Sequence, residues 1–344
     1  MIRIFFAATL AMAISLVGTR VLINVLTKRK IGQPIHEDVV NHIAKAGTPT
    51  MGGIAIVAAA VLSYGISGWY RGIYTVRGIL VVAAIAGAGL VGFCDDWISI
   101  KNERNLGLSK RAKTVGLLAV ACGFSITLVM ITNQHTSLSF TRFNSFSWGE
   151  LGRVGWVIWA VVLIYGFSNA VNLTDGLDGL AAGSGIFAFS AFVVIGFWTF
   201  RYHLVYDLAY GLDLSVVAAA MLGACAGFLW HNAAPAKIFM GDTGSLAIGT
   251  GLACLALTTN TTLLLLIIGG LFVAETLSVI IQVASFRLFH RRVFKMAPIH
   301  HHFEMMGWPE TRVIIRLWML TAGCTAAGIG LFYRDFLVLT GTLS

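Results

Sequence analysis

Long apolar runs alternate with short polar loops along almost the whole chain. Each membrane-spanning helix needs about 20 largely apolar residues, and hydropathy on that criterion predicts about ten spans. The runs begin near Ile4, Met51, Gly78, Thr114, Val154, Leu180, Ser215, Ser245, Thr262 and Val313, and the last ends near Tyr333. No soluble domain, linker or repeat interrupts them. The pattern predicts an all-α polytopic membrane protein with one integral-membrane domain over residues 1–344.

The composition agrees with a membrane protein. The chain is 57% hydrophobic and 11% charged, whereas soluble domains carry about 25% charged residues. Its net charge is +9, but the cations lie on separated short loops, which disfavours nucleic-acid binding. The five cysteines form no CxxC pair, so neither a zinc site nor a disulfide framework is indicated. The first run lacks a signal-peptide cleavage pattern, and we expect it to be a retained span.

Lysine and arginine are distributed unevenly between the two sets of loops. One set holds 15 of them and the other holds 7. The richer set comprises loops 28–50, 95–113, 171–179, 231–244 and 286–312. Positively charged loops stay in the cytoplasm. We therefore expect this set to face the cytoplasm and both termini to lie outside.

The unusual polar residues fall on the same predicted inner loops. They are Asp95, Asp96, Asp175, Asp178, Asp242 and the triplet His300, His301 and His302. Loops that are distant in sequence thus bring acids and histidines to one side of the bilayer. This distribution predicts an active-site cleft at the cytoplasmic face.

Asp95 and Asp96 are adjacent carboxylates at the end of a span. Such a pair suits Mg²⁺, which is usually held by one or two carboxylates and substrate phosphate oxygens. A solvated pair that ends a helix explains the same two residues equally well.

The segment 169–179 is more specific. Asn172, Asp175 and Asp178 recur every three residues and share one face if the segment is helical. Gly176 permits close approach of a ligand. An amide and two carboxylates on one face could read a base and hold metal-bound water, although a polar capping turn is the alternative.

The segment 239–245 places Asp242 between glycines at the mouth of a span. This acid could reach a metal ion, and Phe239 could stack on a flat ring. Asn232 is a nearby polar candidate. A glycine-rich turn with an N-cap aspartate is the alternative.

The triplet His300–His302 is a poor metal-ligand set, because consecutive side chains point in different directions. Hydrogen bonds to phosphate or sugar suit histidine better. Lys45 and Thr50 could clamp a pyrophosphate, and Lys113 could do likewise, although lysines on inner loops also simply follow the charge bias.

Together these groups indicate carboxylates, Mg²⁺ and a pyrophosphate at a membrane surface. Phosphoryl transfer needs mainly positioning and charge neutralisation, which such a set supplies. A secondary transporter or flippase is the rival from another class. Transporters place ionisable groups near the bilayer midplane, and Glu275 is the clearest acid within a span here.

These motifs resemble the polyprenyl-phosphate N-acetylhexosamine-1-phosphate transferases, most closely the phospho-N-acetylmuramoyl-pentapeptide transferases. The matching stretches are KAGTPTMGG at 45–53, DD at 95–96, NAVNLTDGLDGLA at 169–181, FMGDTGSLAIG at 239–249 and MAPIHHHFE at 296–304. The last is the specific one, because relatives that use other sugars carry a different histidine pattern. Two positions depart from the family: Ser99 stands where relatives often have lysine, and 35–41 lacks the usual Gly-Pro.

The resemblance implies ten spans, a homodimer in the inner membrane of a bacterium, and a role in peptidoglycan synthesis. The reaction would transfer phospho-MurNAc-pentapeptide from UDP-MurNAc-pentapeptide to undecaprenyl phosphate, giving lipid I and UMP with Mg²⁺ required. The nearest alternative is a sister transferase that uses another UDP-HexNAc. Direct attack by the lipid phosphate is favoured, with a covalent aspartyl intermediate as the alternative.

The resemblance also assigns roles to residues. The implied catalytic residues are Asp95, Asp96, Asp242, Lys113 and His301. The implied metal ligands are Asp242 and Asp175. The implied substrate contacts are Lys45, Thr50, Asn172, Asp175, Gly176, Leu177, Asp178, Asn232, Phe239, Gln282, His300, His301 and His302.

Overall fold

The computed structural model describes residues 1–29, 47–69, 72, 74–101, 107–146 and 149–341, and within them it contains helices and no named strand. The ten long helices are α1 (Ile2–Lys28), α2 (Gly53–Trp69), α3 (Val76–Lys101), α4 (Lys110–Ile131), α5 (Gly152–Thr174), α6 (Leu180–Arg201), α8 (Gly211–Asn232), α9 (Gly241–Thr258), α11 (Gly270–Phe289) and α13 (Glu310–Leu339). The short ones are α7 (His203–Tyr206), α10 (Leu264–Ile268) and α12 (Ile299–Glu304). The predicted all-α architecture is confirmed.

Eight of these helices are long and apolar enough to cross a membrane. The two other long helices are α2, which has 17 residues, and α9, which begins with the polar sequence GDTGS. The ten long helices correspond to the ten predicted spans. The ninth differs in its start: the chain turns after Thr258, forms α10, and starts α11 only at Gly270.

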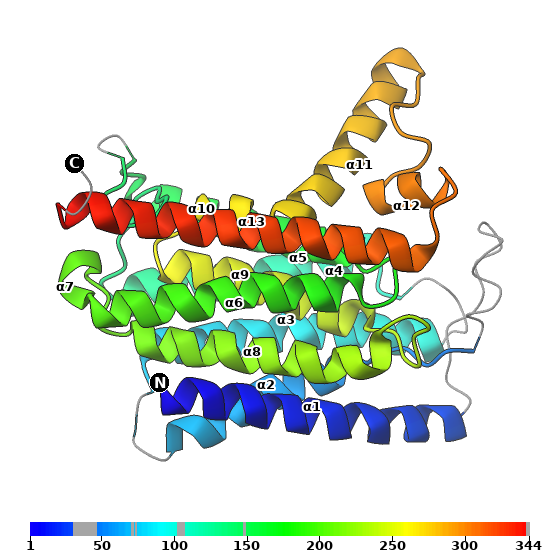
Figure 1. Ribbon diagram of the computed structural model, residues 1–344, viewed down its shortest axis with the longest axis horizontal. Helices are drawn as coiled ribbons and strands as arrows, with labels where there is room; N and C mark the ends of the chain where they lie inside the picture. Colours follow the sequence, from blue (N-terminus) through cyan, green and yellow to red (C-terminus); the bar gives the residue numbers. More distant parts are fainter. Residues whose placement is uncertain (30–46, 70–71, 73, 102–106, 147–148, 342–344) are drawn as a thin grey trace.

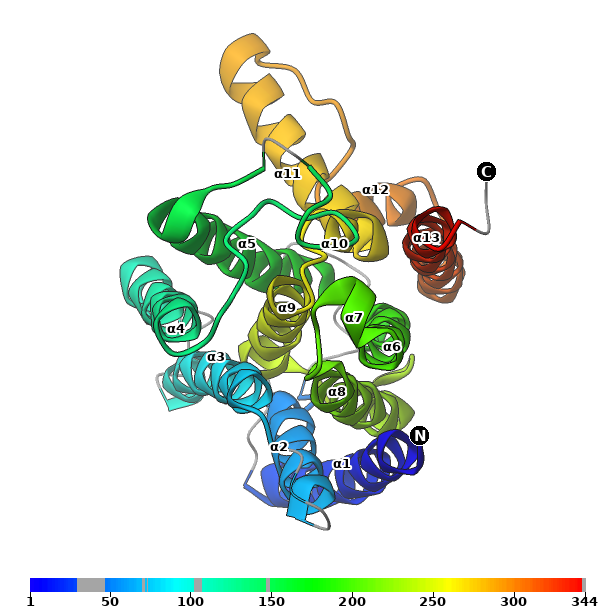
Figure 2. The same cartoon turned by 90° about the vertical axis from the view of Figure 1, so that its left-hand side faces the viewer.

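Helix α9 lies at the centre of the bundle, with α3, α5, α6 and α8 around it (Figure 2). Every residue from Thr243 to Thr258 is buried. Glycines on its neighbours allow this close packing. A Cβ added to Gly53 of α2 would lie 2.0 Å from the nitrogen of Gly244, and one added to Gly92 of α3 would lie 2.3 Å from the carbonyl oxygen of Asp242. The first turn of α9 is therefore wedged between α2 and α3.

The start of α1 and the end of α13 lie at the same end of the bundle, and α12 lies toward the opposite end (Figure 1). This arrangement agrees with an even number of crossings. Helix α11 leaves the bundle and projects away from it (Figures 1 and 2). Large apolar side chains on its outer half are exposed, including Ile280, Phe286 and Phe289. In a bilayer this half would contact lipid rather than water.

Candidate functional site

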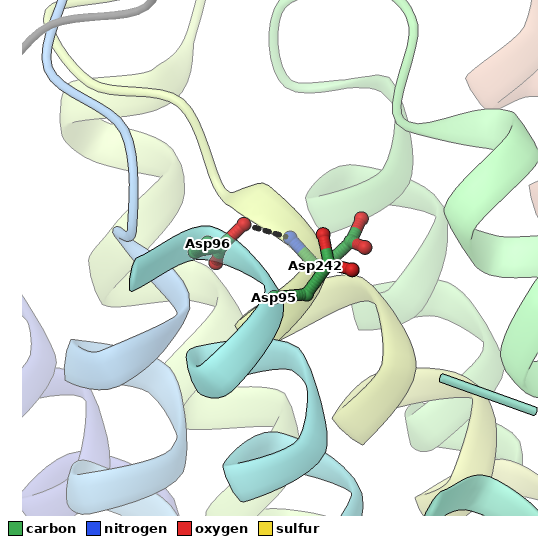
Figure 3. A group of neighbouring side chains, drawn as sticks. All are labelled: Asp95, Asp96 and Asp242. Atoms are coloured by element: carbon green, nitrogen blue, oxygen red, sulfur yellow. Dashed lines mark hydrogen bonds between the residues drawn. The ribbon is translucent and has the colours of Figure 1, made fainter. Parts of the chain in front are cut away.

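Three carboxylates from two helices meet at one point. Asp95 and Asp96 belong to the last turns of α3, and Asp242 belongs to the first turn of α9 (Figure 3). Each offers an oxygen that lies within 4.8 Å of those of the other two. The close contact at Gly92 makes this possible, because α3 passes directly against the backbone of Asp242. The predicted pair and the distant third acid are thus brought together.

Asp96 caps the N-terminus of α9. Its Oδ1 accepts a hydrogen bond from the backbone N–H of Asp242 at 3.0 Å, and its Oδ2 accepts from the N–H and hydroxyl of Thr243 at 3.0 and 2.6 Å. Exposed N–H groups at a helix start need such an acceptor, and the helix dipole favours a negative charge there. Asp96 is 8% exposed. Both of its oxygens are therefore already engaged in positioning the turn that carries Asp242.

Asp242 has a partner on each carboxylate oxygen. Its Oδ1 accepts from Nδ2 of Asn172 at 2.6 Å, and its Oδ2 forms an ion pair with Nζ of Lys113. The same Asn172 nitrogen lies 2.9 Å from Oγ of Ser245. Helices α4 and α5 thus add a cation and an amide to the acids of α3 and α9.

Asp95 faces Asp242 and the loop before α4. Its Oδ1 accepts from the backbone N–H of Leu108 at 3.0 Å. The chain comes close here because residue 107 is glycine: a Cβ at Gly107 would lie 2.3 Å from the carbonyl oxygen of Asp95. Three carboxylates at this spacing repel one another unless a cation or proton intervenes. Carboxylate oxygens suit Mg²⁺, so the donor set fits this ion.

Asp175 lies beside this group but is not one of its three members. It follows the last residue of α5 as its C-cap. Burial, together with the negative charges of Asp242, Asp96 and Asp178, raises the pKa of Asp175 well above its ordinary value. The predicted ligand pair Asp242 and Asp175 is thus close enough to interact electrostatically, whereas the tighter group joins Asp242 to Asp95 and Asp96.

Asp178 points toward a neighbouring loop. Its Oδ2 accepts from the backbone N–H of Ala236 at 2.9 Å, and its own N–H donates to Oε1 of Glu310 at 3.1 Å. Leu177 is buried in an apolar cluster with Leu271 of α11 and residues of α13. The segment after α5 is therefore held by contacts with the loop before α9, with α11 and with α13.

The segment before α2 pairs with the segment before α9. The N–H of Phe239 donates to the carbonyl of Pro49 at 2.8 Å, and the N–H of Gly52 donates to the carbonyl of Phe239 at 2.9 Å. Thr50 lies between the two residues, Pro49 and Gly52, whose backbones are hydrogen-bonded to Phe239. Thr50 and Phe239 are thus neighbours in space although they lie far apart in sequence. Lys45, the remaining predicted member of this group, lies outside the described residues.

All three histidines of α12 use Nδ1 within the protein. Nδ1 of His300 lies 3.0 Å from Glu275, and Nδ1 of His301 lies 2.7 Å from Glu304. Nδ1 of His302 accepts from the backbone N–H of Lys295 at 3.1 Å. Each ring is thereby oriented through this nitrogen, so Nε2 is the atom that remains for another role.

Two predicted contact residues are used to hold loops. Oε1 of Gln282 accepts from the N–H groups of Val293 and Phe294, and its Nε2 donates to the carbonyl of Phe294 at 3.1 Å. Asn232 is buried and donates to the carbonyl of Ile238 at 2.9 Å. These side chains fix the segments that lead to α12 and α9.

The sequence analysis did not select Thr243, Ser245, Glu304 or Glu310 as site residues. Thr243 and Ser245 belong to the motif around Asp242, and Glu304 ends the histidine motif. Their place within these motifs was the sequence signal that could have identified them. Glu310 lies in the stretch GWPETRVIIRLW at 307–318, which also resembles the family but was assigned no site residue. Its contact with the backbone of Asp178 is visible only in three dimensions.

Comparison with known proteins identifies the relatives of this chain. Residues 78–260 match the glycosyl transferase family 4, and residues 45–57 match the phospho-N-acetylmuramoyl-pentapeptide-transferase signature 1. The chain is 47% identical to the phospho-N-acetylmuramoyl-pentapeptide-transferase of Frankia alni, with 97% of this chain and 98% of the relative covered. The enzymes of the same name from Rhodococcus jostii and Streptomyces avermitilis are 48% and 46% identical, with 98% and 97% of this chain and 99% and 98% of the relatives covered.

Proposed function

The chain belongs to the phospho-N-acetylmuramoyl-pentapeptide-transferase family, and we propose that it transfers phospho-MurNAc-pentapeptide from UDP-MurNAc-pentapeptide to undecaprenyl phosphate. The products are lipid I and UMP. The observation that carries this proposal is the meeting of Asp95, Asp96 and Asp242 with Lys113 and Asn172 at the ends of four helices. This is a group suited to holding a cation and a diphosphate at a membrane boundary.

The reaction proceeds by attack of an oxygen of the lipid phosphate on the sugar-linked phosphorus of the donor. A new P–O bond forms there, and the P–O bond to UMP breaks with its electron pair leaving on UMP. A phosphate monoester has a second pKa of about 6, so the acceptor is largely dianionic at neutral pH. A strong base is not required, and we assign Asp95 the role of orienting the acceptor phosphate.

The other residues supply position and charge. Asp242 and Asp95 would hold Mg²⁺, and Asp175, whose charge interacts with that of Asp242, would be a further ligand. When bound, the ion neutralises charge on the diphosphate. Lys113 brings a second cation to the same carboxylate. Asp96 positions the first turn of α9. The segment from Asp175 to Asp178 and the ring of Phe239 would contact the nucleotide. His301 and His302 of α12 would contact phosphate or sugar, whereas His300 is buried.

Direct transfer is favoured over a covalent aspartyl intermediate. Both oxygens of Asp96 accept hydrogen bonds from α9, and both oxygens of Asp242 are paired. An Asp95→Asn variant tests the remaining acid. Near-normal turnover of this variant at high pH would argue against Asp95 as either base or nucleophile.

The orientation is also part of the proposal. The excess of Lys and Arg on the loops at the site end supports a cytoplasmic active site with both termini outside. Accessibility of single cysteines introduced at the two ends to a membrane-impermeant reagent tests it. The homodimer implied by the family is tested by crosslinking in native membranes.

The activity is tested by measuring UMP release by the purified full-length protein with both substrates, with and without Mg²⁺. We expect release only with Mg²⁺, and loss of release on chelation with recovery when Mg²⁺ is returned. UDP-GlcNAc serves as the competing donor. Incorporation of GlcNAc-phosphate without any muramoyl transfer would reassign the chain to a sister transferase. Absence of UMP release would overturn the proposed activity.

A further inference from the structure

Glu275 of α11 and His300 of α12 form a buried pair. Both side chains have zero exposure, and Nδ1 of His300 lies 3.0 Å from Oε2 of Glu275. The same oxygen lies 3.5 Å from the backbone nitrogen of His300. The two residues are 25 positions apart, so the pair joins the projecting helix to the histidine motif.

The pair is costly to bury, which indicates a role beyond packing. A buried carboxylate needs a charged or hydrogen-bonded partner. Among the described residues, Oε1 of Glu275 and Nε2 of His300 have no hydrogen-bond partner. Buried polar atoms of this kind are uncommon in native proteins and call for an explanation.

The imidazole of His300 reaches the nucleotide-side segment at Gly176. A Cβ added to Gly176 would lie 2.5 Å from Nε2 of His300 and 3.0 Å from its Cε1. The ring therefore occupies the space that a side chain at position 176 would need. Asp175 is the adjacent residue, so any displacement of the ring is transmitted directly to the backbone beside it.

Helix α11 holds the next part of the same segment as well. Leu271, one turn before Glu275, packs in the apolar cluster that contains Leu177. One face of α11 thus packs in the cluster that buries Leu177 and contacts Gly176 through His300.

We propose that Glu275 is a positioning residue that acts through His300. Its carboxylate holds the imidazole at Nδ1, and the ring, seated against Gly176, fixes the segment from Asp175 to Asp178 for the donor nucleotide. The inference rests on the proposed transferase function. It adds a residue that stabilises the nucleotide-binding segment without contacting the nucleotide.

The test is a Glu275→Gln variant of the full-length protein, with KM measured separately for the UDP-linked donor and the lipid acceptor. Glutamine keeps the size of the side chain and removes its charge. We expect the donor KM to rise at least about tenfold, which corresponds to a coupling within the usual range for contacting residues. We expect the acceptor KM to change less than about twofold. Equal changes in both constants would overturn the inference.

Asp213→Asn provides the matched control. Asp213 is also a buried carboxylate, and it accepts hydrogen bonds from Thr75 and Tyr64. It belongs to the first turn of α8, and the start of this helix lies at the end of the bundle away from α12 (Figure 1). We expect this variant to melt at a lower temperature with an unchanged donor KM. A donor KM that rises as much as in Glu275→Gln would show that loss of any buried acid has the same effect, and would overturn the inference.

A double-mutant cycle tests whether Glu275 acts through the histidine. In a His300→Gln background, Glu275→Gln should raise the donor KM by less than about twofold, because its partner is already gone. An undiminished effect in that background would overturn the inference. If Glu275→Gln does not fold, Gly176→Ala tests the same contact from the other side. We expect it to raise the donor KM alone, and an unchanged donor KM would contradict us.

The transferase activity and the role of Glu275 are tested by different results. A wild-type protein that releases no UMP would overturn the proposed function. A wild-type protein that releases UMP, combined with a Glu275→Gln variant of normal donor KM, would overturn only the role of Glu275.

Discussion

The Oδ1 atom of Asp96 lies 3.0 Å from the backbone nitrogen of Asp242, so a side chain of α3 caps the helix whose first turn carries the third acid of the cluster. The two members of the Asp95–Asp96 pair consequently have different surroundings. Asp95 accepts one hydrogen bond from the loop backbone at Leu108, whereas Asp96 accepts three from α9.

Asp96→Asn should therefore lower both stability and turnover. The amide replaces one acceptor by a donor that faces the N–H groups of α9, and loss of a helix cap costs roughly 1 kcal/mol. Asp95→Asn should abolish most turnover with little change in melting temperature. Thermal unfolding and UMP release measured on both variants check this. An Asp96→Asn protein that melts like the wild type would contradict the capping role.

Lys113→Gln should change the response to Mg²⁺. The ion pair between Lys113 and Asp242 competes with a cation for that carboxylate. Its removal should lower the half-saturating Mg²⁺ concentration by roughly two- to fivefold, as expected for an ion pair worth up to about 1 kcal/mol. The maximum rate should fall by about 100-fold, because a charge near the transferring group is lost.

Lys110→Gln is the control for this experiment. Lys110 is exposed at the start of the same helix. Its substitution should leave the Mg²⁺ dependence within about twofold of the wild type, since exposed charges contribute little. A half-saturating Mg²⁺ concentration that rises in Lys113→Gln would refute the competition.

Gly53→Ala should destabilise the protein, whereas Gly65→Ala in the same helix should not. The added methyl group at Gly53 would meet the backbone of Gly244 at 2.0 Å, and the one at Gly65 would meet nothing within 4 Å. Overpacking typically costs about 1–3 kcal/mol, while alanine for glycine within an open helix face gains up to about 1 kcal/mol. Thermal unfolding of the two variants in the same detergent should move in opposite directions.

Gln282→Glu should loosen the segment that leads to α12. The substitution places a second acceptor opposite the carbonyl of Phe294, where the wild-type amide donates. We expect faster proteolysis between α11 and α12 and a higher donor KM, with little change in melting temperature. Gln282→Met, which removes all these hydrogen bonds without adding repulsion, should show a smaller effect. Equal protection of all three proteins from the protease would count against this role.

The apolar pattern predicted the number of long helices because every helix that crosses the bilayer needs an apolar run of about 20 residues. It misplaced the ninth start because Leu263 to Ile268 are as apolar as a span, although the chain turns there before Gly270. Hydropathy registers the side chains and is insensitive to such a break in the backbone.

The motifs predicted which acids lie together but not how each is used. Asp95 and Asp96 are indistinguishable by residue type, and only the path of α9 makes one of them a cap. Gln282 was expected to contact substrate, and in this structure its amide is bonded to the backbone of residues 293 and 294. The role of each of these side chains depends on where it points in the folded protein, and its position in the sequence does not show this.

The dependence of α9 on a cap from α3 means that the acid cluster cannot be transplanted as one continuous stretch of sequence. If the gene were divided within the loop 133–151, one polypeptide would carry Asp95 and Asp96 and the other would carry Asp242. Neither half should release UMP when expressed alone, and co-expression of the two should restore it. Reconstitution from fragments would thus depend on whether helices of separate polypeptides can re-form a single capped turn.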